Sequence, residues 1–194
     1  VDKVIEEIRA ELPKGLEIVD LMSTKDFLDA SIKNVIKTLF EAILLVILVV
    51  FVFLQSLRST IIPTISIIVS LVGTFAFLMV AGFSLNMITL FALVLVIGTV
   101  VDDSIVVVEA VQAKFDEGYK SSYKATVDAM GGISTALVAT TFVFMAVFIP
   151  VSFMGGTTGT FYKQFGLTMA VAVGISLINS LSLSPALCSL IMTP

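Results

Sequence analysis

Residues 85–111 read LNMITLFALVLVIGTVVDDSIVVVEAV, and this stretch decides the fold. The run exceeds the roughly 20 apolar residues that an α-helix needs to cross the hydrocarbon core of a bilayer. It nevertheless contains the acidic residues Asp102, Asp103 and Glu109. The first prediction from this sequence is therefore a transmembrane helix that carries carboxyl groups.

Four other apolar runs have a similar length, and together they predict an all-α membrane protein built as a five-span helical bundle. The composition agrees: 58% of the residues are hydrophobic, 13% are charged and the mean hydropathy is +1.11. A soluble domain of average composition is far less apolar, and one of 194 residues could not bury five such runs. The predicted spans are 39–57, 61–82, 85–111, 133–153 and 165–191.

Charge and cysteine content exclude two classes of function. The net charge of −4 leaves no basic excess to attract nucleic acid, so we expect no nucleic-acid partner. Cys188 is the only cysteine and the chain has no histidine, which removes disulfides and the usual soft metal ligands. We therefore expect no metal site.

Two polar stretches flank or interrupt the spans. Residues 1–38 combine a helical pattern, a turn at 13–15 and an alternating run at 16–21, which predicts a short α/β remnant of a soluble domain. Residues 112–130 predict a polar loop or an interfacial helix. Charge alone leaves the orientation undecided, because 1–38 also carries basic residues. If 1–38 belongs to a translocated domain, the positive-inside rule places the loops at 58 and 112–130, with four basic residues against Lys163 on the other side, in the cytoplasm.

Asp102 and Asp103 are the candidate chemical residues. An ionised carboxylate at the centre of a span costs ~2.5–3.5 kcal/mol on insertion scales, and such residues usually mark ion or proton pathways. Adjacent side chains point about 100° apart around a helix, so each can face a different neighbour. The pair is predicted to carry protons, and the alternative is a buried structural charge site needed only for assembly.

Glu109 lies seven residues after Asp102, on nearly the same helix face and ~10 Å further along the axis. It is a candidate exit of a proton relay, although an interfacial residue near a helix end is the simpler interpretation. Other polar and small residues predict helix contacts. Interhelical hydrogen bonds are expected from Thr99, Ser104, Thr140, Thr141 and Asn179, and close helix approach from Gly98, Gly166 and Gly174.

The five predicted spans contain no Lys, Arg or His, so nothing in them neutralises the ionised aspartates. A cation must therefore come from outside these helices, which indicates that they form part of a larger bundle.

Residues 98–109, GTVVDDSIVVVE, closely resemble the fourth transmembrane helix of the hydrophobe/amphiphile efflux branch of the resistance-nodulation-division transporters. The resemblance continues through residues 37–42 and 53–64, similar to the second helix and its following turn. Residues 150–156 and 183–188 resemble the fifth and sixth helices. By this resemblance, 1–38 are the C-terminal end of a periplasmic porter domain, and 39–194 supply helices two to six of a twelve-helix transmembrane domain.

The family implies a secondary active transporter rather than an enzyme, with the proton gradient as its energy source and no cofactor. It implies an inner-membrane, multi-pass proton/drug antiporter of a Gram-negative bacterium. The antiporter would act as a homotrimer in a tripartite pump with a periplasmic adaptor and an outer-membrane channel, and would expel amphiphilic drugs. Asp102 and Asp103 match the paired relay aspartates, and the relay lysine belongs to a second half that is absent here. Ser104 and Ala110 stand where relatives often have Ala and Asn.

Two other functions compete with drug transport. An intramembrane aspartyl protease needs two carboxyl groups that converge on one water, whereas adjacent residues of one helix diverge. A related membrane subunit that assists protein export or lipid movement stays open, because a proton relay does not specify the cargo.

Overall fold

The structure, a computed structural model, describes residues 24–83 and 86–194, apart from the side chains of Thr24, Asp26 and Thr157. Within these residues the chain forms helices only, and five helical segments are long and apolar enough to cross a membrane. The predicted all-α, five-span bundle is confirmed. The α/β pattern of residues 1–21 lies outside the described residues. The helices are α2 (Thr24–Leu54), α3 (Leu57–Val80), α4 (Met87–Asp116), α5 (Ser122–Val151), α6 (Thr157–Leu181) and α7 (Leu183–Ile191).

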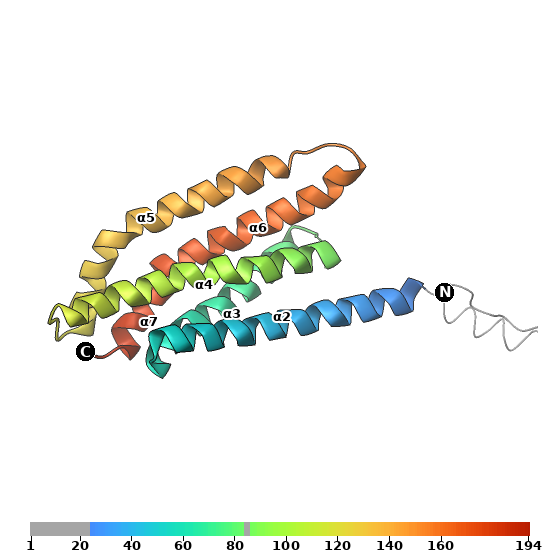
Figure 1. Ribbon diagram of the computed structural model, residues 1–194. Helices are drawn as coiled ribbons and strands as arrows, with labels where there is room; N and C mark the ends of the chain where they lie inside the picture. Colours follow the sequence, from blue (N-terminus) through green and yellow to red (C-terminus); the bar gives the residue numbers. More distant parts are fainter. Residues whose placement is uncertain (1–23, 84–85) are drawn as a thin grey trace, which may run out of the picture.

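The bundle is elongated, and successive spans run up and down along it (Figure 1). The α2–α3 and α4–α5 connections and the C-terminus lie together at one end, here called the Arg58 end. Arg58 Nη1 donates to Thr193 Oγ1 at 2.9 Å, and Ser122 Oγ donates to the Met192 carbonyl at 2.8 Å. These bonds tie the last residues to the starts of α3 and α5. The α3–α4 and α5–α6 connections lie at the opposite end, here called the Gly156 end.

The first span begins earlier than predicted, because α2 starts at Thr24 rather than near residue 39. The change from polar to apolar residues at 39 is therefore not a break in the backbone. No Gly or Pro occurs between 24 and 54, and a helix extends readily through polar residues once it has formed. At 1.5 Å per residue its 31 residues span ~46 Å, longer than the ~30 Å hydrocarbon core.

The predicted second span, 61–82, would place Pro63 in its first turn, where no backbone hydrogen bond would be lost. The structure corrects this, since α3 starts at Leu57 with Ser56 as its N-cap and Pro63 falls in the second turn. The Ser59 carbonyl, four residues back, therefore has no N–H donor at Pro63. Transmembrane helices tolerate such a proline when neighbouring groups compensate.

Of the two alternatives predicted for 112–130, the loop is wrong over most of its length, because these residues are largely helical. Helix α4 continues to Asp116 and α5 begins at Ser122, which leaves a link of 117–121. The polar side chains there fix this tight connection: Tyr119 donates to Asp128 Oδ2 at 2.6 Å, and Lys114 pairs with Glu117 at 2.7 Å. The loop itself is therefore confined to the short link between the two helices.

The predicted span at 165–191 is broken at Ser182, between α6 and α7. The Ser182 amide hydrogen-bonds the Ile178 and Asn179 carbonyls, and Pro185 lies in the first turn of α7, where its missing N–H is tolerated. The helix also begins earlier than predicted, at Thr157 after Gly156, whose φ of 86° suits glycine.

Two apolar clusters fill the interior on either side of a polar layer. On α4 the first cluster runs from Leu90 to Val101 and the second from Val107 to Phe115. Between them lie residues 102–104, the two aspartates and Ser104. The polar layer therefore crosses the middle of the bundle, with apolar packing towards both ends.

Glycines set the spacing between α5 and α6. A Cβ placed on Gly166 would lie 2.7 Å from the Phe148 carbonyl oxygen, and one on Gly174 would lie 2.8 Å from Met145 Cε. The expected close approach is confirmed at both positions. At Gly98 a Cβ would meet nothing within 4 Å among the described residues, so this glycine lies on an open face of α4 and its expected close approach stays a prediction.

We predict that Gly166→Ala in the full-length protein lowers the free energy of unfolding by about 1–3 kcal/mol, because the new methyl group meets a backbone oxygen that cannot move without shifting α5. Thermal unfolding of the detergent-solubilised protein measures the effect. Gly132→Ala is the matched control, since Gly132 is also helical and a Cβ there meets nothing within 4 Å. Equal stability of the two variants would contradict the close packing of α5 and α6.

Candidate functional site

Asp102 and Asp103 lie at the middle of α4. Because the helix covers Met87–Asp116, Asp102 is its sixteenth residue of 30, closer to the centre than the predicted bounds placed it. The helix begins at a well-formed N-cap, where Asn86 and Thr89 exchange side-chain and backbone hydrogen bonds in a capping box. The cap fixes the start of α4, and so places both carboxyl groups far from either end of the span.

Asp103 faces the interior of the bundle. Its side chain is half-buried, and its Oδ2 accepts a hydrogen bond of 2.9 Å from Ser176 Oγ on α6. A hydroxyl can both donate and accept, so this contact holds whether Asp103 is ionised or protonated. Ser176 is almost fully buried, which keeps this contact away from competing groups.

Asp102 points to a different side, as predicted from the 100° step. It lies on a stripe of exposed residues along α4 that recur every three or four positions, the spacing of one helix face. Glu109 lies on the same face, two turns nearer the Arg58 end. We call this face the α4 stripe; its members are Phe91, Leu95, Gly98, Asp102, Val106 and Glu109.

The described residues place no positive charge against either aspartate. Within 24–83 and 86–194 the ion pairs are Lys37 with Glu41 and Lys114 with Glu117, both remote in sequence from the pair. Asp102 and Glu109 have no hydrogen-bond partner in the same part of the chain. Nor do the described residues bring together three potential metal-binding side chains. The site is therefore two carboxyl groups in the middle of a span, one on an open face and one directed inward.

Several polar residues expected to link helices do so around Asp103. Asn179 Nδ2 on α6 donates to Ser70 Oγ on α3 at 2.7 Å. Ser104 on α4 lies 3.4 Å from Ser184 Oγ on α7, which also lies 3.0 Å from Ser66 Oγ on α3. These contacts join α3, α4, α6 and α7 in one buried layer.

Three threonines do not form the expected links. Thr99 and Thr140 donate to carbonyls of their own helices, those of Val96 and Leu137. The Thr141 hydroxyl is buried and finds no partner among the described residues. Hydroxyl groups in helices often bond the preceding turn, and the spacing within one helix does not reveal which of them do so.

Ser176 and Ser184 were not singled out from the sequence. The available signal was their spacing, since serine recurs at 176, 180 and 184, which would lie along one face of a continuous helix. That pattern indicates a polar face on an otherwise apolar span. It does not indicate which neighbouring helix the face meets, because that depends on the packing of the whole bundle.

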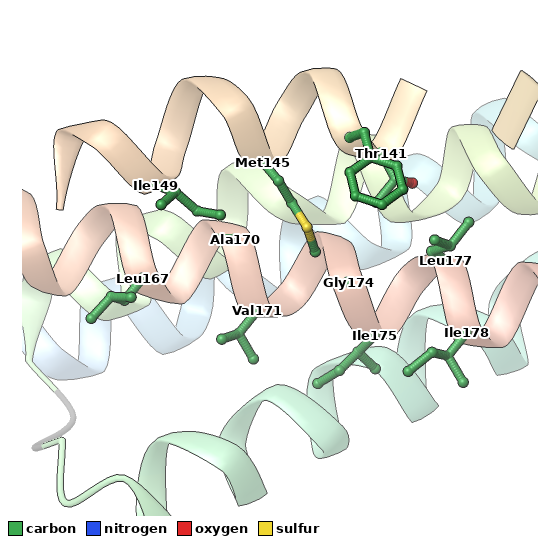
Figure 2. Close-up of a pocket in the computed structure, with 11 residues that line it drawn as sticks. Thr141, Met145, Ile149, Leu167, Ala170, Val171, Gly174, Ile175, Leu177 and Ile178 are labelled. Carbon is green, nitrogen blue, oxygen red and sulfur yellow. The ribbon is translucent and has the colours of Figure 1, made fainter. Parts of the chain in front are cut away.

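A groove lies elsewhere, between α5 and α6, and is lined almost entirely by apolar side chains (Figure 2). Met145 reaches across it towards Gly174, and the Thr141 side chain is the one hydroxyl group in its lining. Neither aspartate lines the groove. The two carboxyl groups therefore lie at the middle of α4, outside this groove.

Comparison with known proteins agrees with the residues that carry the resemblance. The sequence pattern of the AcrB/AcrD/AcrF family matches residues 1–194. The chain belongs to this family. It is 45% identical over 188 residues to the multidrug export protein AcrF of Escherichia coli K12, and 44% identical over 192 residues to the solvent-resistant pump membrane transporter SrpB of Pseudomonas putida.

The alignments to AcrF and SrpB cover 97% and 99% of this chain but 18% of each relative. The toluene efflux pump membrane transporter TtgE, also of Pseudomonas putida, gives the same picture, at 45% identity over 188 residues. This member of the AcrB/AcrD/AcrF family therefore spans about 18% of the length of these relatives. Five apolar helices and membrane-transporter relatives make it a multi-pass membrane protein.

We predict that Asn179→Ala destabilises the full-length protein by about 1–3 kcal/mol, because it leaves the buried Ser70 hydroxyl without its partner. A double-mutant cycle with Ser70→Ala, read from thermal unfolding, should show that the two losses are not additive. Thr140→Val is the control, since the Thr140 hydroxyl bonds only its own helix. Additive losses would show that the bond between α3 and α6 contributes nothing.

Proposed function

We propose that this chain is part of an inner-membrane secondary transporter of a Gram-negative bacterium, which exchanges protons for amphiphilic drugs or solvents. Asp102 and Asp103 are the proton carriers. The observation that supports this most strongly is the position of the two carboxyl groups at the centre of a membrane-spanning helix, without a cation beside them in the described residues. Intramembrane carboxyl groups are costly and are retained chiefly where they handle ions or protons.

The two aspartates have different roles in this proposal, because their side chains point to different sides of α4. Asp103 is held from inside by Ser176, while Asp102 is accessible on the α4 stripe. A helix from the rest of the protein would pack on this stripe and bring the relay lysine that the family resemblance implies. Protonation of the pair releases the lysine and deprotonation attracts it, so the charge state of the pair changes how the two helices pack.

The names of the relatives support the proposed class of transported molecule. AcrF is a multidrug export protein, SrpB a solvent-resistant pump component and TtgE a toluene efflux component. An amphiphilic or apolar cargo follows for this protein by analogy. The homotrimer, the periplasmic adaptor and the outer-membrane channel are part of the same proposal, as is the proton gradient as the energy source without a cofactor.

We predict that Asp102→Asn and Asp103→Asn each abolish the drug resistance that the full-length protein gives to efflux-deficient cells, because an amide cannot bind and release a proton. Growth on a panel of amphiphilic drugs, with expression checked by immunoblot, is the measurement. Glu117→Gln, an exposed acid at the end of α4, is the control and should retain resistance. Resistance that survives either aspartate substitution would overturn the relay, and no resistance from the wild type would favour protein export or lipid movement.

We predict that Glu109→Gln slows transport without abolishing it, since Glu109 is the next acid on the α4 stripe and would pass protons towards the Arg58 end. The initial rate of drug efflux from cells expressing the full-length protein measures this effect. Glu109→Asp is the control, because it retains the carboxyl group and should keep most of the rate. A normal efflux rate in Glu109→Gln would contradict a role in proton transfer and leave Glu109 as a residue at the membrane–water interface.

A further inference from the structure

Ser180 is the one serine in the buried polar layer whose hydroxyl group has no partner among the described residues. It is fully buried, at 0% exposure, in the last turn of α6. An unpaired buried hydroxyl costs about 1–3 kcal/mol relative to a satisfied one. Alanine at this position would remove that cost without changing the shape of the helix. A serine here therefore disfavours stability unless its hydroxyl binds something.

The position of Ser180 indicates what its hydroxyl can bind. It lies four residues after Ser176, which donates to Asp103, and four residues before Ser184, which contacts Ser66 and Ser104. Ser176 and Ser180 lie in one continuous helix, where four residues correspond to ~6 Å along the axis, and two O–H···O hydrogen bonds of ~2.8 Å through one water cover about the same distance. The spacing thus suits a water molecule between neighbouring serines.

The surroundings confine such a water to this layer. The apolar clusters border the layer towards both ends of the bundle, with Val100 and Val173 in the first cluster and Val107 and Cys188 in the second, all nearly or fully buried. An internal water needs two to four polar partners, and the Ser176 and Ser180 hydroxyls are two such groups on one face of α6.

We propose that the Ser180 hydroxyl holds an internal water molecule between itself and the Ser176 hydroxyl, and that this water takes part in proton exchange by Asp103. The inference rests on the proposed function and deepens it. Ser180 is a positioning residue in this account, because it acts on Asp103 through the water and Ser176.

Each oxygen atom between Asp103 and solvent gives up one proton for every proton that it gains. The O–H bond of protonated Asp103 breaks as the Ser176 oxygen gains that proton, and Ser176 gives its own proton to the bound water. The water passes one proton to the Ser180 oxygen and stays neutral. Ser180 passes its own proton onward, and the last acceptor is solvent water. The only groups whose protonation changes are therefore Asp103 and solvent.

Ser180→Ala in the full-length protein separates this role from a structural one, because the two roles predict different proton fluxes. If Ser180 only packs, removing an unpaired buried hydroxyl leaves transport unchanged and stability equal or higher. If it holds the water, drug-driven proton flux in proteoliposomes falls several-fold while the thermal unfolding midpoint stays well above the assay temperature. Ser180→Cys should behave like alanine, since a thiol of similar size is a weak hydrogen-bonding group.

Ser189→Ala is the matched control, because this serine of α7 bonds only the Ala186 carbonyl of its own helix. It should keep the wild-type flux. Infrared difference spectra add a second readout: the C=O stretch of protonated Asp103, assigned by its loss in Asp103→Asn, should shift in Ser180→Ala and not in Ser189→Ala.

A wild-type flux in Ser180→Ala overturns the inference, as does a loss of flux that follows a loss of stability or that Ser189→Ala shares. An unshifted carboxyl band overturns it as well. If Asp103→Asn itself retains proton flux, the proposed function fails instead, so the two failures are distinguishable.

Discussion

Hydrocarbon offers no hydrogen bonds, so polar groups in the middle of these helices must find partners within the protein, in water it encloses or in helices that pack on it. This constraint accounts for the polar layer at the centre of the bundle. Asp103 takes its hydrogen bond from Ser176, Asn179 reaches Ser70, and Ser184 joins Ser66 to Ser104. These contacts bring α3, α4, α6 and α7 together, and apolar packing extends from the layer towards both ends.

The same constraint separates the roles of two adjacent residues. Asp103 satisfies it within the described helices, whereas Asp102 does not and lies on the α4 stripe with Glu109. A carboxyl group on an open apolar face calls for a polar or charged partner from the rest of the protein. Membership of the AcrB/AcrD/AcrF family, whose compared members are several times longer than this chain, supports that arrangement.

The sequence predicted the five spans because bilayer thickness imposes a minimum length on apolar runs, and this signal is local. It predicted that Asp102 and Asp103 diverge, because that follows from the helix repeat alone. It did not predict the start of α2 at Thr24, the short α4–α5 link or the break at Ser182, since polar residues can continue a helix and a helix can break within an apolar run. Ser176 as the partner of Asp103 depends on how α6 is rotated against α4, which only the packed bundle determines.

The central claim is that the inward-facing carboxyl group of Asp103 gains and loses a proton in each transport cycle. The most direct test is the number of protons moved per drug molecule in proteoliposomes containing the full-length protein, with and without Asp103→Asn. The account predicts drug-dependent proton movement in the wild type and none in the variant, even when drug still binds. Proton movement of equal size in both proteins would contradict it.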